Sequence, residues 1–476
     1  MAKQKATKIV ERSTSFVVVS NRLPVDRSFD DQGNAQWSMS PGGLVTALGP
    51  VMNAQGGAWV GWPGKPDEQV DPFEWQNYSV VPVELSTEDV EDFYEGMSNS
   101  TIWPLYHDCI VNPEFHREWW DAYVRVNQRF ADEVIRITAH DGIVWVQDYQ
   151  LQLVPKMVRE QRPDVKIGFF LHIPFPPTEL FMQLPWRRQI IEGLLGADIV
   201  GFQVPSAASN FRALARRLVD GKPGRDTLVT ADGRTVTARA YPISLDSKAL
   251  REQAQSDEVK AKMAELLEDL NHPRRIFLGV DRLDYTKGLR HRVRAFGELF
   301  SAGELDPRED VYLQLATPSR ERVDEYQKLH DEIDVMVGRI NSQEGAFGRP
   351  PIQYLYTSVD KVTLCALYQI ADVCVVTPLR DGMNLVAKEY LVAHESDEGA
   401  LVLSEFAGAA LELKQAYMVN PYDLNGMKSE IMKAATDTKA NRSRKMRALR
   451  KQVLTHDIEL WAKNFLDDLG VETDDE

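Results

Sequence analysis

The sequence of 476 residues has few cysteines, no long apolar run and no excess of positive charge. Its three cysteines, Cys109, Cys365 and Cys374, are widely spaced and odd in number, which argues against a disulfide framework or a cysteine metal site. No apolar run reaches the roughly 20 residues that cross a bilayer, and the first residues lack the apolar core of a signal peptide. We therefore expect a cytoplasmic protein with free thiols and no membrane partner.

The formal net charge of -16 argues against nucleic acid as a general partner, because most of the surface would repel a phosphate backbone. An anionic ligand must instead meet a local cluster of cations. The 43% of hydrophobic residues is ordinary for a folded globular chain, and the length is too great for one ordinary core. Two domains are therefore expected.

Strand-like and helix-like runs alternate along nearly the whole chain, which is typical of parallel sheets with helices on both faces. The predicted fold class is α/β, with two Rossmann-like doubly wound domains. We place the first at 1–242, closed by a hairpin that turns at Asp232-Gly233, and the second at 243–440. The pattern from Arg442 to Leu469 is continuously helical, so residues 441–476 are expected to pack back on the first domain.

Ten strands are expected at apolar runs. Those of the first domain are FVVVSNRLP, GIVWVQDY, KIGFFLHIPFP and DIVGFQVP. Those of the second are RRIFLGVDRLDYTKG, VYLQLATPSRE, PIQYLYTSV, DVCVVTPLRDGMN, ALVLSEFAGAA and AYMVNPYD. Open parallel sheets bind ligands outside the carboxyl ends of their strands, so polar residues at those ends are the first candidates for a site.

In the first domain, Arg22 follows one strand, while Asp148 and His172 each end a strongly apolar one. Asp148 could accept hydrogen bonds from sugar hydroxyls, and His172 could do the same or stabilise charge near a reacting carbon. Gly42 and Gly43 open a helical pattern whose first N–H groups suit a phosphate, although such a pair is more often only a tight turn. Tyr94, Trp103 and the pair Trp59 and Trp62 could pack on sugar rings if they lie in loops, but core packing is the commoner role.

In the second domain, cations and a carboxylate follow the strands. Arg282 and Lys287 share one strand-to-helix loop and could clamp a diphosphate, while Arg320 ends the next strand and could hold a second phosphate. Asp381 precedes a helix whose first amides would face the same edge, and Glu389 could bind a ribose. Without the preceding loop, Glu389 would be an ordinary solvated helix residue.

In order and spacing, the chain from about Phe16 to Asp423 resembles the trehalose-6-phosphate synthases of glycosyltransferase family 20. The resemblance rests on SNRLPV, PGGL, SNSTIWPLYH, VQDY, GFFLHIPFP, DRLDYTKGL, TPSRERV, PLRDGMNLVAKE and LSEFAGAA. It implies the GT-B architecture, in which the two domains face across a cleft, and an enzyme that needs neither metal nor cofactor. The implied reaction is retaining transfer of glucose from UDP-glucose, or GDP-glucose, to glucose 6-phosphate.

The resemblance also implies roles for single residues. Acceptor-binding residues would be Arg22, Tyr94, Trp103, Asp148 and Arg320. Donor-binding residues would be Gly42, Gly43, Arg282, Lys287, Val359, Asp381, Met383, Asn384, Leu385, Val386, Ala387, Lys388 and Glu389. Catalytic residues would be His172, Arg282, Lys287 and Asp381. A homo-oligomer and a separate phosphatase acting downstream are implied as well.

Two departures from the family pattern stand out. Gln147 occupies a position where a histidine often precedes the aspartate, and Val359 replaces a bulkier residue of some members. The second leaves open whether the donor base is that of UDP, GDP or ADP.

Other functions remain as alternatives. A phosphorylase of similar architecture would carry a pyridoxal cofactor, and a catalytically silent relative would act as a sugar-phosphate sensor. The phosphatase signature Asp-x-Asp-x-Thr of bifunctional relatives is absent from the sequence.

Overall fold

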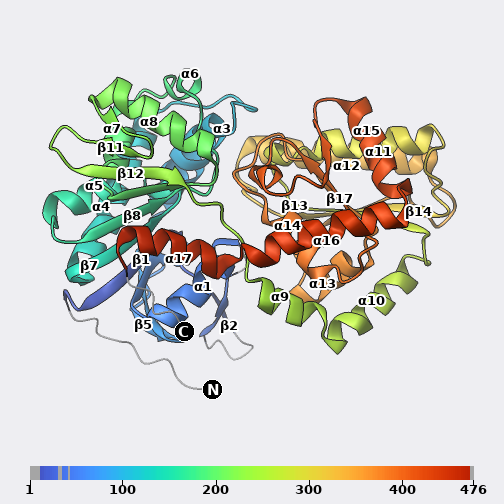
Figure 1. Ribbon diagram of the computed structural model, residues 1–476, viewed down its shortest axis with the longest axis horizontal. Coiled ribbons are helices and arrows are strands. Elements are labelled where there is room, and N and C mark those ends of the chain that lie inside the picture. The colour runs from blue at the N-terminus through green and yellow to red at the C-terminus, as the bar shows by residue number, and fades with distance from the viewer. Residues whose placement is uncertain (1–10, 30–34, 41–42, 472–476) are drawn as a thin grey trace. The chain divides into compact units, whose positions relative to one another are not determined.

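The computed structural model describes residues 11–29, 35–40 and 43–471, and the chain divides into two compact units. The first consists of Met1–Ile243 and Glu459–Glu476, and the second of Ser244–Ile458. Each unit is built around a sheet of its own, which Figure 1 shows. The chain therefore leaves the first unit once and returns to it with its last helix.

Among the described residues, the sheet of the first unit has ten strands in the order β10-β11-β12-β9-β8-β7-β1-β4-β6-β5. The strands from β12 to β6 run parallel, and antiparallel strands extend both edges. A separate antiparallel pair joins β2 to β3. The strands are β1 (Thr14–Arg22), β2 (Val25–Phe29), β3 (Ala35–Met39), β4 (Ala58–Trp62), β5 (Phe73–Trp75), β6 (Tyr78–Pro82), β7 (Thr138–Gln147), β8 (Lys166–Phe170), β9 (Ile199–Phe202), β10 (Lys222–Pro223), β11 (Thr227–Val229) and β12 (Thr235–Ala240).

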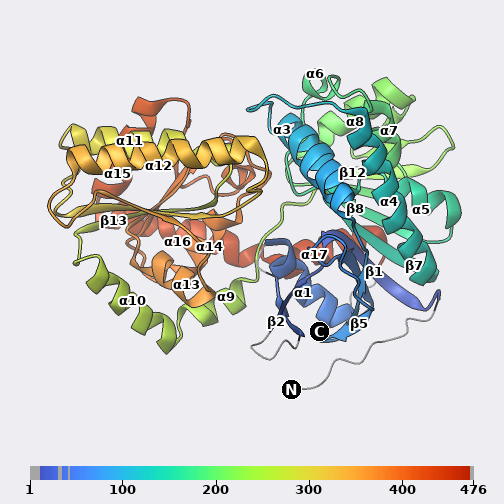
Figure 2. The same ribbon diagram turned by 180° about the vertical axis from the view of Figure 1, so that it is seen from behind.

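Helices cover both faces of this sheet. In Figure 1 helix α17 crosses in front of the strands, whereas α4 is in front in Figure 2, which views the molecule from behind. Helix α4 buries Tyr123, Val126, Phe130 and Val134, at the three- and four-residue spacing of one helix face. The helices are α1 (Gly43–Gln55), α2 (Thr87–Asp89), a π-helical segment (Val90–Ile102), α3 (Trp103–Tyr106), α4 (Arg117–Ile137), a 3₁₀ turn (Tyr149–Leu151), α5 (Val154–Gln161), α6 (Thr178–Phe181), α7 (Arg187–Leu194), α8 (Pro205–Val219) and α17 (Ile458–Leu469).

Helix α17 docks through aromatic stacking. Trp461 and Phe465 stack on Trp145 with ring centroids 5.2 and 4.7 Å apart. A Cβ atom on Gly168 or Gly201 would lie 2.6 or 2.7 Å from the Phe465 ring, so both strands need glycine for the ring to approach. The indole of Trp461 also donates to the Tyr241 carbonyl over 3.2 Å. These contacts anchor the carboxyl-terminal helix in the first unit.

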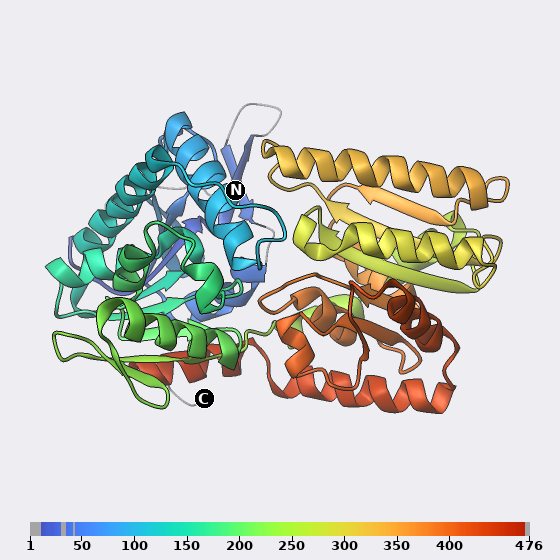
Figure 3. The ribbon, with the colours of Figure 1, turned by 90° about the horizontal axis from the view of Figure 1, so that it is seen from above.

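The sheet of the second unit has the order β15-β14-β13-β16-β17-β18, with every pairing parallel. In chain order this is 3-2-1-4-5-6, the arrangement of a dinucleotide-binding domain. Figure 2 shows α11, α12 and α15 on one face and α13, α14 and α16 on the other, and in Figure 3 α11 and α12 lie side by side.

The strands of the second unit are β13 (Arg275–Arg282), β14 (Asp310–Thr317), β15 (Ile352–Tyr356), β16 (Val373–Val376), β17 (Ala400–Ser404) and β18 (Tyr417–Val419). The helices are α9 (Ser247–Ala254), α10 (Asp257–Asp269), a 3₁₀ turn (Tyr285–Lys287), α11 (Leu289–Ser301), α12 (Asp324–Glu344), α13 (Lys361–Ile370), α14 (Leu385–Ala393), a 3₁₀ turn (Gly408–Leu411), α15 (Leu424–Thr436) and α16 (Lys439–Thr455).

The predicted α/β class with two Rossmann-like, doubly wound sheets is confirmed, and each expected apolar run contains a strand. The hairpin turning at Asp232-Gly233 is confirmed as β11 paired with β12. One expectation is wrong, because the pattern from Arg442 to Leu469 is interrupted between α16 and α17. Trp59 lies on β4 and is fully buried, with its indole donating to Ser20 Oγ over 2.7 Å, which confirms core packing as its role.

Candidate active site

Several of the predicted site residues end or follow the strands between which the strand order of each sheet reverses. In the first unit the order reverses between β1 and β7, and Arg22 ends β1 while Asp148 follows β7. In the second it reverses between β13 and β16, and Arg282 ends β13 while Asp381 comes after β16. Crevices at such reversals are the usual ligand sites of open α/β sheets. The structure thus supplies a candidate half-site in each unit.

Arg22 is held in place without losing its exposure. Its guanidinium lies 2.8 Å from the Asp26 carboxylate and 5.3 Å from the centre of the Trp62 ring. A Cβ atom on Gly64 would lie 2.2 Å from Arg22 Nη2. Position 64 therefore needs glycine to leave room for the guanidinium. The Arg22 side chain remains 45% exposed. It is therefore an accessible cation at the carboxyl end of β1.

Tyr94 and Trp103 belong to an unusual stretch of helix. Tyr94 lies in the π-helical segment and reaches the Arg22 site through Trp62, whose ring centroid is 5.9 Å from its own. Trp103 begins α3 and is buried beside His107, with ring centroids 4.2 Å apart. π-Helical turns are rare and often mark functional sites. Sequence reasoning found both aromatics but not the π-helix that presents them.

A buried carboxylate fixes the start of that segment. Asp89 accepts from Arg125 over 3.0 Å, from the Ser86 amide over 3.1 Å and from Arg129. Burial alone would raise the pKa of Asp89, but hydrogen bonds from Arg129 and Ser86 outweigh it and lower the pKa. The carboxylate therefore stays charged and ties the π-helical segment to α4.

Asp148 and His172 contact each other at neighbouring strand ends. The Asp148 backbone has φ 72° and ψ 173°, a region that is nearly exclusive to glycine and is found in other residues mainly at functional sites. Its Oδ1 accepts the His172 amide over 3.1 Å, and His172 Nε2 lies 2.9 Å from Gln147 Oε1. Burial lowers the pKa of His172 to about 3. The imidazole is consequently neutral near pH 7.

Only the second glycine of the predicted pair is described by the structure. Gly42 lies outside the described residues, and Gly43 is the first residue of α1.

In the second unit, the loops after β13 and β16 pack closely, and Lys287 of the first forms an ion pair with Asp381 of the second. Gly288 has φ 69°, and a Cβ atom on it would lie 2.2 Å from the Thr377 carbonyl oxygen. This close approach brings the loop after β13 against the loop after β16. Lys287 Nζ then lies 2.6 Å from Asp381 Oδ2, which also accepts from Asn384 Nδ2 over 3.1 Å.

A second carboxylate, Asp284, organises the cations. It is fully buried and accepts from the Thr286 amide and hydroxyl over 2.9 and 2.8 Å. Its Oδ2 accepts from Tyr326 over 3.2 Å and from Arg320 over 3.4 Å, with Arg282 Nη2 3.9 Å away. Burial would raise the pKa of Asp284, but the nearby positive charges outweigh it and lower the pKa to about 2.

Asp284 is a buried carboxylate whose contacts sequence reasoning missed, although it stands in the same loop as Arg282 and Lys287. The signal available was a carboxylate between two predicted phosphate-binding cations. The Arg282 side chain is 46% exposed and Arg320 only 5%. The exposed guanidinium of Arg282 can therefore contact an anion. Arg320 is buried and bonded to Asp284, and its backbone is strained, with φ 49°.

The start of α14 is a tight turn built for close approach. Asn384 has φ 84° and caps the helix by accepting the Ala387 amide over 3.1 Å. A Cβ atom on Gly408 would lie 1.9 Å from the Gly382 carbonyl, and the Ala409 amide donates to the Met383 carbonyl over 2.9 Å. The backbone amide of Ala387, which was predicted to bind the donor, therefore already donates to the side chain of Asn384. The N–H groups of Leu385 and Val386, in the first helical turn, belong to the set that lacks intrahelical acceptors.

The remaining donor candidates have different surroundings. The Lys388 side chain turns inward to Glu412, with Nζ 2.7 Å from Oε2, and burial lowers its pKa. A donor contact from Lys388 would have to come from its backbone. Glu389 Oε2 accepts from the Tyr368 hydroxyl over 2.8 Å, and burial raises the pKa of this carboxyl. Val359 is partly exposed in the loop between β15 and α13.

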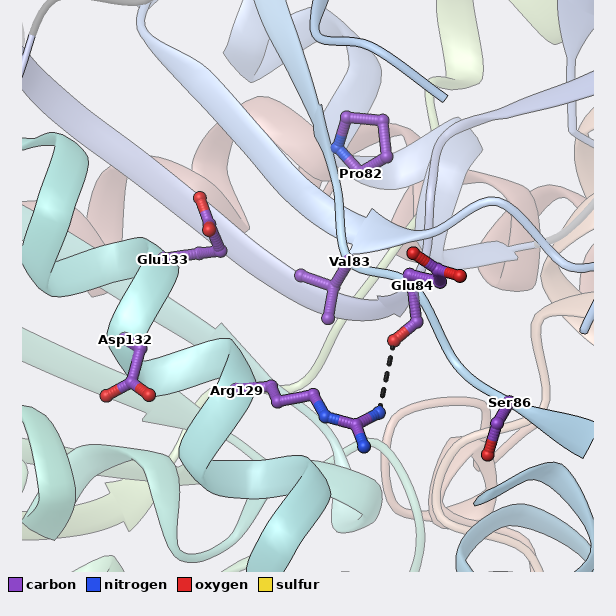
Figure 4. Close-up of a pocket in the computed structure, with 7 residues that line it drawn as sticks. All are labelled: Pro82, Val83, Glu84, Ser86, Arg129, Asp132 and Glu133. Carbon is purple, nitrogen blue, oxygen red and sulfur yellow. Dashed lines mark hydrogen bonds between the residues drawn. The ribbon is translucent and has the colours of Figure 1, made fainter. Parts of the chain in front are cut away.

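Two of the pockets in the described part of the chain, one in each unit, are not lined by any predicted site residue. One of about 290 Å³ opens at the carboxyl ends of β13, β14 and β15, and Tyr326, which binds Asp284, lines it. Another of about 530 Å³ lies between α4 and the segment after β6, where Arg129 Nη1 donates to the Glu84 carbonyl over 3.3 Å (Figure 4).

Two absences concern residues 11–29, 35–40 and 43–471. In these ranges no three His, Cys, Asp or Glu side chains are grouped closely enough to hold a metal ion. The helices there are too short or too polar to cross a bilayer.

Comparison with known families gives one match over nearly the whole chain. Residues 14–470 match the sequence model of glycosyltransferase family 20. A trehalose-6-phosphate synthase of Mycobacterium avium (strain 104) is 53% identical over 470 residues, which cover 96% of each chain.

Solved structures agree with this match. An α,α-trehalose-phosphate synthase (UDP-forming) from Burkholderia xenovorans, in complex with glucose-6-phosphate, superposes with a TM-score of 0.88 at 33% identity. The match covers 96% of this chain and 99% of that one. An E. coli structure bound with UDP-2-fluoro glucose gives a TM-score of 0.87 at 32% identity, covering 96% and 100%.

Proposed function

The chain belongs to glycosyltransferase family 20, and from this premise we propose that it transfers glucose from a nucleoside diphosphate glucose to glucose 6-phosphate. The product would be α,α-trehalose 6-phosphate, with retention at the donor carbon. UDP-glucose is the donor we propose first, because the similar Burkholderia protein is UDP-forming and the E. coli one binds a UDP-glucose analogue. GDP-glucose is the alternative.

The observation that carries the proposal is the cationic cluster where the second sheet reverses. Lys287 pairs with Asp381 in the loop that leads into α14, and Arg282 lies near Asp284 in the same loop as Lys287, so fixed positive charges and a helix N-terminus occur in one unit. This arrangement suits a diphosphate that gains negative charge as the sugar–oxygen bond breaks. Glu389, already oriented by Tyr368, supports the assignment of a ribose contact.

Arg22, Tyr94, Trp103, Asp148 and Arg320 form the proposed acceptor set. Arg22 supplies an exposed guanidinium for a phosphate, and the strained Asp148 a carboxylate for hydroxyls. A glucose-6-phosphate complex of a similar protein supports this choice of ligand.

In the proposed mechanism Asp381 positions the donor glucose and does not attack it. Its Oδ2 is already bonded to Lys287 and Asn384, which lowers its nucleophilicity. The bond from the donor carbon to the diphosphate breaks while the acceptor hydroxyl adds on the same face. The hydroxyl proton passes to the leaving phosphate oxygen, so retention needs no glycosyl–enzyme intermediate. A carboxylate nucleophile with a second carboxyl about 5 Å away, as in retaining glycosidases, is the competing route.

A homo-oligomer, a cytoplasmic location and a separate downstream phosphatase complete the proposal. Removal of the phosphate from the product requires a hydrolysis that glucosyl transfer does not provide.

Initial rates with UDP-glucose, GDP-glucose and ADP-glucose, each with and without glucose 6-phosphate, test the proposal. We expect nucleoside diphosphate release that depends on glucose 6-phosphate and is fastest with UDP-glucose. Binding of glucose 6-phosphate with no release from any donor would contradict it and favour the sensor alternative.

A further inference from the structure

Gln147 and His172 form a hydrogen-bonded side-chain pair at the carboxyl edge of the first sheet. Gln147 is the last residue of β7, His172 lies two residues beyond β8, and these strands are neighbours. Gln147 Oε1 and His172 Nε2 are 2.9 Å apart. The imidazole also packs edge-on against Phe170, with ring centroids 4.7 Å apart. Both the position and the tilt of the imidazole are therefore defined.

The hydrogen bonding of the Gln147 side chain does not explain its presence by a gain in stability. Its side chain is fully buried, and within the described part of the chain its amide nitrogen has no hydrogen-bond partner. A buried amide that makes one hydrogen bond and leaves its donor unsatisfied tends to cost stability relative to an apolar side chain of the same size. What this glutamine provides is the oxygen that faces the imidazole.

We propose that Gln147 is a positioning residue that holds the neutral imidazole of His172 as its Nε2–H tautomer. The ring donates through Nε2 to Gln147 Oε1, so Nδ1 keeps its lone pair and acts as a hydrogen-bond acceptor. On the function proposed above, the group that it accepts from is a hydroxyl of the transferred glucose. Asp148 is the charged group in contact with His172. Its carboxylate accepts from the backbone amide of His172, whereas the imidazole ring is bonded to Gln147.

The tautomer can be read without any substrate, so the result is independent of the proposed function. Protonated and unprotonated ring nitrogens differ in ¹⁵N shift, and the His172 signal among the nine histidines is the one that disappears in His172→Asn. We expect protonated Nε2 in the wild-type protein. Gln147→Met, which removes the acceptor at similar volume, should shift the ring toward a mixture of tautomers. Protonated Nδ1 in wild type, or an unchanged signal in Gln147→Met, would overturn the proposal.

Gln152→Met is the control for loss of a buried amide, because Gln152 is buried in the segment after β7 and its side chain bonds to Tyr106, Tyr123 and Tyr149 and not to His172. It should leave the His172 signal unchanged. A change as large as that of Gln147→Met would mean that loss of any buried amide here disturbs the ring, which also overturns the proposal.

The dependence of kcat on pH in Gln147 variants then distinguishes a role in positioning His172 from a role in packing. Gln147→Met should lower kcat by roughly 10- to 100-fold at every pH, the size of loss found when a partner that orients a metal-ligating histidine is removed. Gln147→Glu keeps an accepting oxygen but places a negative charge beside the imidazole, which raises the pKa of His172. Its activity should therefore approach wild type at high pH and fall as the pH drops and the ring is protonated. Equal, pH-independent losses in both variants would indicate packing alone and overturn the proposal.

Discussion

Lys287 Nζ lies 2.6 Å from Asp381 Oδ2, although 94 positions separate the two residues in the sequence. The contact exists because β13 pairs with β16, so the loops after these two strands meet where the strand order reverses. The ammonium group is thereby fixed before any ligand arrives. Such preorganisation is what stabilises charge that develops in a transition state.

Asp284 should make stability depend on acid pH. Its pKa in the folded protein, about 2, is below the ordinary value of 3.8, so its contribution is complete above about pH 4 and is lost as the pH falls toward 2. The difference corresponds to about 2 kcal/mol of unfolding free energy. Denaturant unfolding of wild type and Asp284→Asn at pH 7, 5, 4 and 3 measures it. The gap between the two proteins should narrow below pH 4, and a gap that stays constant would contradict this reading.

The strained backbone of Asp148 predicts unequal effects of two small substitutions on stability. Asp148→Gly relieves a strain of about 1–3 kcal/mol but loses the hydrogen bond to the His172 amide, so stability should change by less than about 1 kcal/mol. Asp148→Ala loses the bond and keeps the strain, so it should be less stable than the glycine variant. Both should weaken use of glucose 6-phosphate by about tenfold or more. Denaturant unfolding and KM for the acceptor check these outcomes, and an alanine variant as stable as the glycine variant would show that position 148 is unstrained.

Docking of α17 should contribute strongly to the stability of the first unit. Phe465 is fully buried on Trp145, Gly168 and Gly201, and Phe465→Ala should cost roughly 3–5 kcal/mol. Leu460→Ala on the same helix, where the residue is 36% exposed, should cost about 1 kcal/mol or less. Thermal and denaturant unfolding compare the two. A Phe465→Ala variant as stable as Leu460→Ala would mean that α17 does not stabilise the fold.

Much of this fold could be predicted from the sequence because buried parallel strands are short apolar runs with polar residues at their ends. The runs before Arg22, Asp148, Arg282 and Asp381 are of this kind. Strand order could not be predicted, since pairing between distant strands leaves no local pattern. Strand β4 was missed because its glycines and tryptophans resemble a loop, whereas the structure packs Trp59 in the core.

The chemistry of the site was predicted less completely. Residue type and position identified Lys287 and Asp381, but not that they pair, because the pairing depends on the close approach at Gly288. The burial of the Lys388 side chain could not be predicted either, because its partner Glu412 lies farther along the chain, after the 3₁₀ turn Gly408–Leu411. The role of Asp284 depends on burial, which a charged residue in a polar loop does not reveal.

The most direct test of the central claim is the turnover of Arg282→Ala with saturating donor and acceptor. Loss of one preorganised donor to a developing oxyanion is typically worth about 2.7–4 kcal/mol, so kcat should fall by roughly 10²–10³. Arg294→Ala is the matched control, because that arginine is exposed on α11 and paired with Glu298, and its kcat should stay at the wild-type value. If Arg282→Ala keeps kcat within about tenfold of wild type, Arg282 does not stabilise the leaving diphosphate and the assignment of the cationic cluster is wrong.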